Sequence, residues 1–126
     1  MSFTTADVVA KVRDLAVARP YFIYSPPVTS ESGRPACLYV HYDTDGTLVG
    51  GCIVGQALLS LGVPAETLRK YDESDGANAS TVVSELLDVG DCEELLWLDE
   101  VQRKQDNCYE WVGAVHCADA NYSLDN

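Results

Sequence analysis

The feature that most constrains the fold is a short apolar segment at residues 52–61, which follows Gly50-Gly51 and ends before Gly62. Its apolar side chains would point to every side of a helix, and a helix of that kind is normally buried all round. A helix needs about 20 apolar residues to span a bilayer, so this segment is too short for that role. We therefore expect the rest of the chain to enclose a central helix at 52–61.

Five other segments place apolar residues at helical spacing. Thr4 or Thr5 is predicted to cap the first helix and Ser80 the one that follows residues 71–78, which are polar and read as a turn. Asp91 and Glu94 have the spacing of a capping box. The predicted helices are a first one that ends at about residue 18, before Arg19-Pro20, and then 65–70, 80–89, 92–105 and 109–120.

A β-hairpin is predicted at residues 37–49, where two β-prone runs flank Asp43-Thr44-Asp45-Gly46. Asp-Gly between such runs is a strong hairpin signal, because both residues tolerate a positive φ. The expected fold class is therefore α+β and predominantly α. It comprises five or six helices around the buried helix 52–61 and one small hairpin, in a single acidic domain that spans 1–126.

The expected location is the cytoplasm. The N-terminal residues lack a basic stretch followed by an apolar one, which is the pattern of a signal peptide. Five cysteines cannot all pair within one chain, and five free thiols are typical of a reducing compartment. No apolar run is long enough to cross a membrane.

The net charge of −12 is concentrated in one half of the sequence. Residues 1–70 contain six acids and six bases, whereas residues 71–126 contain fourteen acids and only Arg103 and Lys104. Binding to nucleic-acid phosphates or to an anionic membrane needs clustered bases, so direct contact with either is not expected. The same charge favours a cationic partner.

The acidic residues gather on two predicted helices, together with two large apolar residues, Leu96 and Trp97, that fall outside the inward-facing stripe. An exposed aromatic ring among carboxylates is typical of a site for a basic protein surface. We therefore expect a non-enzymatic interaction protein, with a purely solubilising acidic face as the alternative. The predicted partner-binding residues are Asp88, Asp91, Glu93, Glu94, Trp97, Asp99 and Glu100.

Two other functions remain open. Cys52 is predicted at a helix start, where the helix dipole can activate a thiol, and His41 or His116 could serve as a base. This would make the protein a cysteine-dependent hydrolase or transferase, although a buried cysteine is the commoner case. Alternatively, the Gly50-Gly51 helix start could hold a small anionic ligand, but close helix packing explains the glycines equally well.

Metal and cofactor sites are not expected. Cys37 with His41, or Cys108 with the adjacent His116 and Cys117, lack the tight paired spacings of structural zinc sites. The run from Asp43 to Gly46 resembles the start of a calcium loop. However, the twelfth position of that loop is Val54, where a carboxylate would be required.

Two stretches resemble a family of small uncharacterised proteins of actinobacteria and actinobacteriophages. One begins at Tyr39-Val40-His41 and continues through Gly51-Cys52-Ile53-Val54-Gly55-Gln56-Ala57-Leu58, and the other begins at Val101-Gln102-Arg103-Lys104-Gln105-Asp106 and ends at Trp111-Val112-Gly113-Ala114-Val115. The resemblance implies a helical domain around 51–61 and a bacterial or phage origin, with no catalytic residue. It favours an interaction role, such as a phage-encoded modulator that binds a basic protein in the host cytoplasm.

Overall fold

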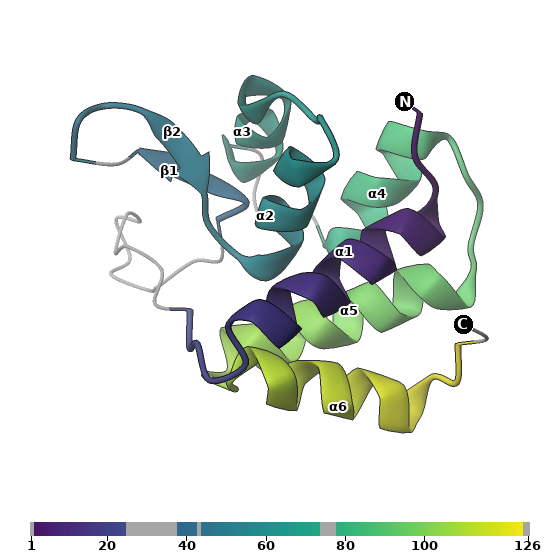
Figure 1. The fold of residues 1–126 in the computed structure, drawn as a ribbon. Helices are drawn as coiled ribbons and strands as arrows, with labels where there is room; N and C mark the ends of the chain where they lie inside the picture. The colour runs from purple at the N-terminus through teal and green to yellow at the C-terminus, as the bar shows by residue number, and fades with distance from the viewer. Residues whose placement is uncertain (1, 25–37, 43, 74–77, 125–126) are drawn as a thin grey trace.

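The computed structural model describes residues 2–24, 38–42, 44–73 and 78–124. Within these ranges the chain forms six helices and one two-stranded antiparallel sheet (Figure 1). The fold is predominantly α with a small β-hairpin, as the sequence predicts. The elements in chain order are α1 (Thr5–Ala18), β1 (Val40–Tyr42), β2 (Leu48–Gly50), α2 (Ile53–Ser60), α3 (Ala65–Glu73), α4 (Ala79–Leu87), α5 (Glu93–Asp106) and α6 (Trp111–Asn121).

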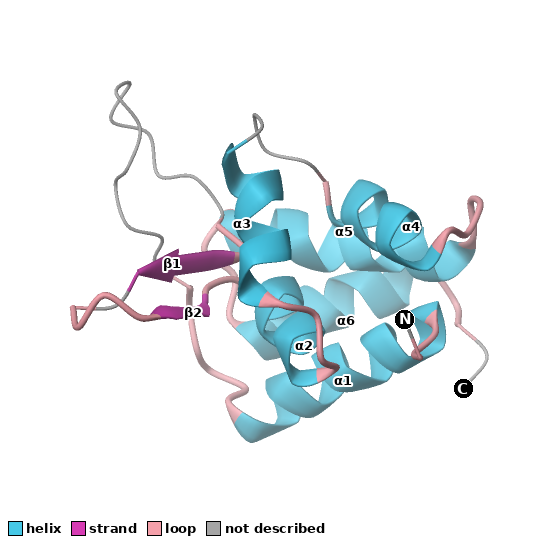
Figure 2. Ribbon diagram, turned by 90° about the horizontal axis from the view of Figure 1, so that it is seen from above, coloured by secondary structure: helices cyan, strands magenta, loops and turns pink. Residues whose placement is uncertain are grey.

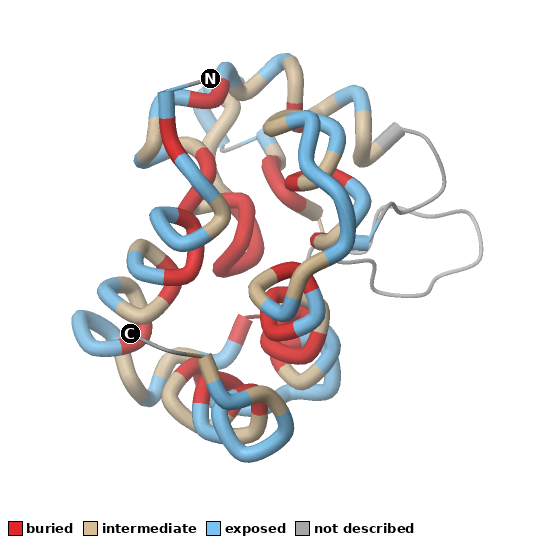
Figure 3. The backbone as a smooth tube through the Cα atoms, turned by 90° about the vertical axis from the view of Figure 1, so that its right-hand side faces the viewer, coloured by how far each residue is buried: buried red, intermediate tan, exposed pale blue. Residues whose placement is uncertain are grey.

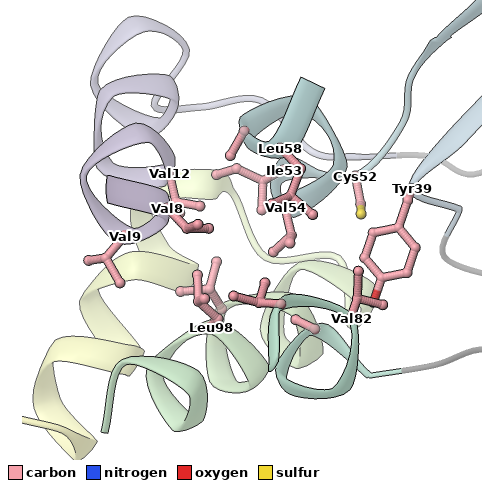
Figure 4. Packing of buried hydrophobic residues seen from close by; sticks show 14 of the residues in the cluster. Val8, Val9, Val12, Tyr39, Cys52, Ile53, Val54, Leu58, Val82 and Leu98 are labelled. Atoms are coloured by element: carbon pink, nitrogen blue, oxygen red, sulfur yellow. The ribbon is translucent and has the colours of Figure 1, made fainter. Parts of the chain in front are cut away.

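The core lies where α1, α2, α4 and α6 pack around α5. Buried positions on these helices face one another across the interior in Figure 3, and the exposed positions form the outer surface. Figure 4 shows the centre of this packing, with Val8 and Val12 of α1, Val54 and Leu58 of α2, and Leu98 of α5. Tight burial of such side chains contributes about 1.5–3 kcal/mol each to the hydrophobic stabilisation.

Helix α2 is largely buried, but not on every side as predicted, since Gln56 and Leu59 are half-buried and Ser60 is exposed. Five of its residues, Ile53, Val54, Gly55, Ala57 and Leu58, are buried. Its central position is shared with α5, which contacts four other helices.

Helix α1 begins and ends as predicted. The Thr4 hydroxyl accepts a hydrogen bond from the Asp7 amide at 3.2 Å, and the Asp7 carboxylate accepts one from the Thr4 amide at 2.9 Å. Arg19, before Pro20, is the C-cap residue. The reciprocal bonds form a capping box, which satisfies two of the four free N–H groups at the helix start.

The hairpin is shorter than predicted. Val40 pairs with Gly50 and Tyr42 with Leu48, so the sheet covers only three residues on each strand. In the turn, Gly46 has φ +85°, and the Asp45 carboxylate accepts a hydrogen bond from the Thr47 amide at 3.0 Å. That bond lowers the pKa of the Asp45 carboxyl. Residue 37, the expected start of the first strand, lies outside the described residues. Figure 2 shows the hairpin projecting to one side of the helices.

Two predicted caps are wrong. Helix α4 begins at Ala79 with Asn78 as its N-cap, so Ser80 lies inside the helix. Helix α5 has Cys92 as its N-cap, and the Asp91–Glu94 capping box does not form. At α4 the reason is tertiary: Gln102 and Asp99 of α5 accept hydrogen bonds from the first amides of α4, at 2.8 Å in both cases.

Residues 71–73 are also helical rather than part of the predicted turn, since α3 continues to Glu73. The Asp72 carboxylate accepts hydrogen bonds from the Tyr39 and Val40 amides, at 2.9 and 3.1 Å. These bonds join the last turn of α3 to the start of β1. A contact between residues more than thirty positions apart outweighs the local polarity of the segment.

Candidate functional site

The structure divides the seven predicted partner-binding residues into three groups. Asp88, Asp91 and Glu93 are exposed. Glu94 and Asp99 are half-buried, whereas Trp97 and Glu100 are buried, with 0% and 2% of their surface exposed. The seven residues therefore do not form one exposed face.

The expectation of an exposed Trp97 is wrong. Its indole Nε1 donates to Asp119 Oδ1 of α6 at 2.9 Å, and the Arg13 guanidinium of α1 lies 4.9 Å from the ring centroid. Arg13 also donates two hydrogen bonds to the Asp119 carboxylate, at 2.9 and 2.7 Å. The bonds from Arg13, aided by the one from Trp97, lower the pKa of Asp119, and the same pairing raises the pKa of Arg13. Trp97 thus joins three helices in the core.

Asp99 and Glu100 also serve the fold rather than a partner surface. Asp99 caps α4 as described above, and a carboxylate at a helix N-terminus is stabilised by the helix dipole. Glu100 accepts a hydrogen bond from the Asn121 side-chain amide at 2.6 Å and pairs with Arg103. Half-buried Glu94 lies 3.5 Å from the Thr5 hydroxyl, within hydrogen-bond reach.

The physical reason for these corrections is the position of α5 between other helices. The prediction of a single inward-facing stripe assumes that neighbouring helices cover only one side of α5. Here α4 packs on one side of α5 while α1 and α6 pack on the other. Successive residues of an α-helix are rotated by about 100°. Viewed down the axis of α5, its buried residues, with Leu95 at one edge and Glu100 at the other, therefore cover more than half of the helix circumference.

Two of the three exposed acids, Asp91 and Glu93, line a groove where α4 turns into α5. Asp88 ends α4 with φ 53°, in the left-handed region, and this reverses the chain direction. The groove has a volume of about 440 Å³, and its lining residues are Ser80, Asp91, Cys92, Glu93, Leu95 and Leu96. We call Asp88, Asp91, Cys92, Glu93 and Leu96 the α4–α5 corner.

Leu96 supplies the apolar group that Trp97 was expected to supply. Its side chain is 49% exposed, and the neighbouring Leu95 is buried. Both Leu96 and Trp97 lie outside the predicted inward stripe, but periodicity alone does not tell which of them a neighbouring helix covers. Sequence reasoning thus finds the acidic residues of the groove but misses Leu96 and Cys92 as part of it.

Cys52 is an unsuitable nucleophile in this structure. Its side chain is fully buried, and Figure 4 places it in the core. His116 is exposed on the surface of α6, and His41 is half-buried on β1. A thiol without solvent exposure can meet a substrate only if the core opens, which favours the structural interpretation of Cys52.

The start of α2 has no space for an anion. The Cys52 amide donates to Leu38 O at 2.9 Å, and the Ile53 amide donates to Gln105 Oε1 at 2.8 Å. A Cβ atom at Gly51 would lie 2.2 Å from Leu38 O, and one at Gly55 would lie 2.0 Å from Tyr39 O. Close packing against residues 38–39 therefore explains Gly51 and Gly55, and packing against Gln56 explains Gly50, where a Cβ would lie 2.7 Å from Gln56 Cγ. The ligand hypothesis at Gly50-Gly51 loses its basis.

Within residues 2–24, 38–42, 44–73 and 78–124, no three metal-ligating side chains of histidine, cysteine, aspartate or glutamate lie together. Cys108, His116 and Cys117 are thus not assembled into a site. Cys37 and Asp43 lie outside the described residues, so the candidates that include them are not placed. None of the described helices is both long and apolar enough to span a bilayer.

Comparisons of the chain with protein-family models, with curated proteins and with solved structures find no match.

Proposed function

We propose that this chain is a non-enzymatic interaction protein that binds a basic protein surface through the α4–α5 corner. The observation that carries the proposal is the groove of about 440 Å³, which the half-exposed Leu96 and the buried Leu95 line together with the exposed Asp91 and Glu93. An apolar side chain of the partner would enter the groove. Lysine or arginine residues beside it would face the carboxylates.

Apolar contact and charge have different roles in this proposal. Covering a half-exposed leucine contributes about 1 kcal/mol, since about 25 cal/mol is gained per Å² of apolar surface buried. Exposed carboxylates add little affinity one by one, but together they accelerate association and select against acidic partners. The excess of acids in residues 71–126 extends this attraction beyond the groove itself.

The resemblance to proteins of actinobacteria and their phages adds a proposal about the partner. If the chain is phage-encoded, the basic surface would belong to a host protein, and binding would modulate that protein in the host cytoplasm. The geometry of the groove favours a partner that presents one apolar side chain among bases, as an amphipathic basic helix does.

The test is a titration of the full chain with a defined probe, a short amphipathic peptide that has leucine on one face and lysine on the other. We expect Leu96→Ser to weaken binding at least fivefold and Asp91→Asn combined with Glu93→Gln to weaken it at least tenfold. Glu94, Asp99 and Glu100 are left unchanged, because they contact other helices and their loss would affect folding.

Matched controls separate the groove from overall charge and hydrophobicity. Asp14→Asn with Glu110→Gln removes two other exposed carboxylates, and Ile23→Ser removes an apolar side chain that is 48% exposed, close to the 49% of Leu96. These controls should weaken binding much less than the groove variants do. Equal losses in the controls and in the groove variants would overturn the proposal, because the peptide would then be responding to net charge alone.

A further inference from the structure

A second groove lies beside the same two helices, next to the α4–α5 corner. Its volume is about 450 Å³, and it differs from the groove of the corner because all of its lining residues are polar or charged. They are Asn78, Asp99, Gln102, Arg103, Asp106 and Asn107. Asn78 is the N-cap of α4, and the other five belong to α5 or to its C-cap. We call this the polar groove and the one of about 440 Å³ the corner groove.

The two grooves adjoin each other at Ser80 and Asp99. Ser80 lines the corner groove and Asp99 lines the polar groove, and the Asp99 carboxylate accepts a hydrogen bond from the Ser80 amide at 2.8 Å.

One face of α5 also connects the two grooves. Residues that alternate in spacing between four and three lie on the same face of a helix. The residues of this series line the corner groove first and then the polar groove: Cys92, Leu96, Asp99, Arg103 and Asp106. The two grooves are therefore parts of one track that follows α5 from its start to its end.

The track is negatively charged over its whole length. The acids that line it are Asp91, Glu93, Asp99 and Asp106. Among the described residues that line the two grooves, Arg103 is the one base, and its guanidinium pairs with Glu100. A cationic side chain is therefore attracted to the polar groove as well as to the corner groove.

We propose that the polar groove binds a lysine or arginine side chain of the same partner helix whose apolar side chain enters the corner groove. This inference rests on the proposed function and adds a second contact to it. Asp99 and Asp106 supply the negative charge. The side-chain oxygens of Asn78 and Asn107 can accept hydrogen bonds from an ammonium or guanidinium group.

The distance between the grooves sets the spacing of the two contacts in the partner. Arg103 follows Leu96 by two turns of α5, about 10 Å along the helix axis. A partner helix that lies along α5 has the same rise per residue, so its base would be about seven residues from its apolar side chain and on the same face. Since the polar groove adjoins only one side of the corner groove, this base is needed at one end of the partner helix.

The test compares extended forms of the short leucine–lysine peptide in titrations of the full chain. Two peptides extend it by about two helical turns, one at the N-terminus and one at the C-terminus, with two arginines on the leucine face. We expect one extension to strengthen binding about fivefold and the other to change it by less than about twofold, because only one of them lies over the polar groove. Matched extensions with glutamine in place of arginine should leave binding nearly unchanged.

Asp106→Asn tests whether the gain comes from the polar groove. Asparagine keeps an oxygen for the hydrogen bond that Gln105 Nε2 donates to Asp106 at 3.0 Å, and circular dichroism would check that the variant is folded. We expect it to lose most of the gain from the extension and to bind the short peptide as Asp14→Asn does. Asp14→Asn is the matched control, because it removes another exposed aspartate, from α1, and should keep the gain.

The outcomes distinguish this inference from the proposed function. Equal gains from the two arginine extensions, or a gain that Asp106→Asn leaves intact, would overturn the contact at the polar groove while the corner groove still binds the short peptide. If the short peptide fails to bind but an extended one binds in a way that depends on Asp106 and not on Leu96, the corner groove is overturned and the polar groove is supported. A chain that binds none of the peptides would overturn both.

Discussion

At the scale of single residues, the same type of side chain has opposite roles in this protein according to its neighbours. Asp91 and Glu93 are exposed at the α4–α5 corner, whereas Asp99 and Asp119 bind groups on other helices. A sequence pattern cannot separate these cases, because the donors are distant in the chain. Asp119 and Arg13, for example, are 106 positions apart.

Replacement of Asp119 should reveal its structural role through the pH dependence of stability. The pKa of its carboxyl lies below the ordinary 3.8 in the folded chain, so its ionised form stabilises the fold above about pH 4. This contribution falls as the pH drops from 3.8 toward the lower folded value, since the unfolded chain takes up the proton first. We expect Asp119→Asn to lower the free energy of unfolding by about 1 kcal/mol at pH 7, a figure reduced for the partial exposure of the pair.

Urea denaturation at pH 7 and at pH 3 measures this difference. The gap between wild type and Asp119→Asn should be largest at pH 7 and clearly smaller at pH 3. Asp14→Asn, which removes an exposed carboxylate from α1, should leave stability nearly unchanged at both pH values. A gap for Asp119→Asn that stays constant with pH would show that ionisation of the carboxyl does not contribute.

At the scale of the elements, α5 organises its neighbours through polar side chains as well as apolar ones. Asp99 and Gln102 accept hydrogen bonds from the start of α4, and Gln105 accepts one from the start of α2. These residues are spaced by three along α5, so they lie along one face of it. The free amides at two helix starts are thus satisfied by a third helix rather than by local caps.

Gln105→Met should test this arrangement, because it keeps a similar side-chain length but removes the acceptor. Gln105 is fully buried, and its Oε1 accepts from the Ile53 amide at 2.8 Å and from Trp111 Nε1 at 3.3 Å. Leaving a buried donor without a partner costs about 1–3 kcal/mol, so for these two donors we expect a loss of about 2–6 kcal/mol in the free energy of unfolding. Chemical denaturation would measure this loss, and hydrogen exchange at the Ile53 amide would show the local effect.

Asn107→Ala is the control for this prediction. Asn107 also donates a side-chain hydrogen bond at the end of α5, to Arg103 O at 3.0 Å, but it is exposed. Asn107→Ala should lower the free energy of unfolding by less than about 1 kcal/mol, since water can take the place of the exposed Asn107 amide as the donor to Arg103 O. Similar losses for the two variants would contradict a special role for Gln105.

The sequence predicts which segments form helices more accurately than it predicts where each helix begins and ends. The apolar segment 52–61 predicts a buried helix, and α2 is largely buried because most of its side chains are apolar, although its Gln56, Leu59 and Ser60 are partly or fully exposed. The predicted cap at Thr4 is also local and is confirmed, and Asp7 completes it as a capping box. Helix α4 starts elsewhere than predicted because its cap comes from α5, and Trp97 is buried because α6 supplies Asp119. Local signals thus succeed where the contacts are local and fail where another helix supplies the partner.

At the scale of the whole molecule, the two halves of the sequence are not two separate parts. In the structure, α1 from the neutral half packs against α5 and α6 from the acidic half. Both halves therefore build the core, and the acidic residues that remain exposed are spread over the outer surface of a shared fold.

This distribution of charge should make the fold more stable as salt is added. Residues 71–126 contain fourteen acids and two bases. Both bases have close neighbours: Arg103 pairs with Glu100, and Lys104 lies 5.2 Å from the centroid of the Tyr109 ring. Repulsion among the carboxylates therefore outweighs attraction over this half.

Raising the ionic strength from about 0.01 M to about 0.1 M shortens the Debye length from about 30 Å to about 10 Å and weakens that repulsion. We expect the melting temperature to rise by about 2–5 °C, equivalent to about 1 kcal/mol. The measurement is thermal denaturation of the dilute chain at the two ionic strengths. Asp91→Asn with Glu93→Gln should show a smaller rise, because two of the repelling charges are gone. A melting temperature that falls with salt would mean that ion pairs such as Arg13–Asp119 dominate the electrostatic energy instead.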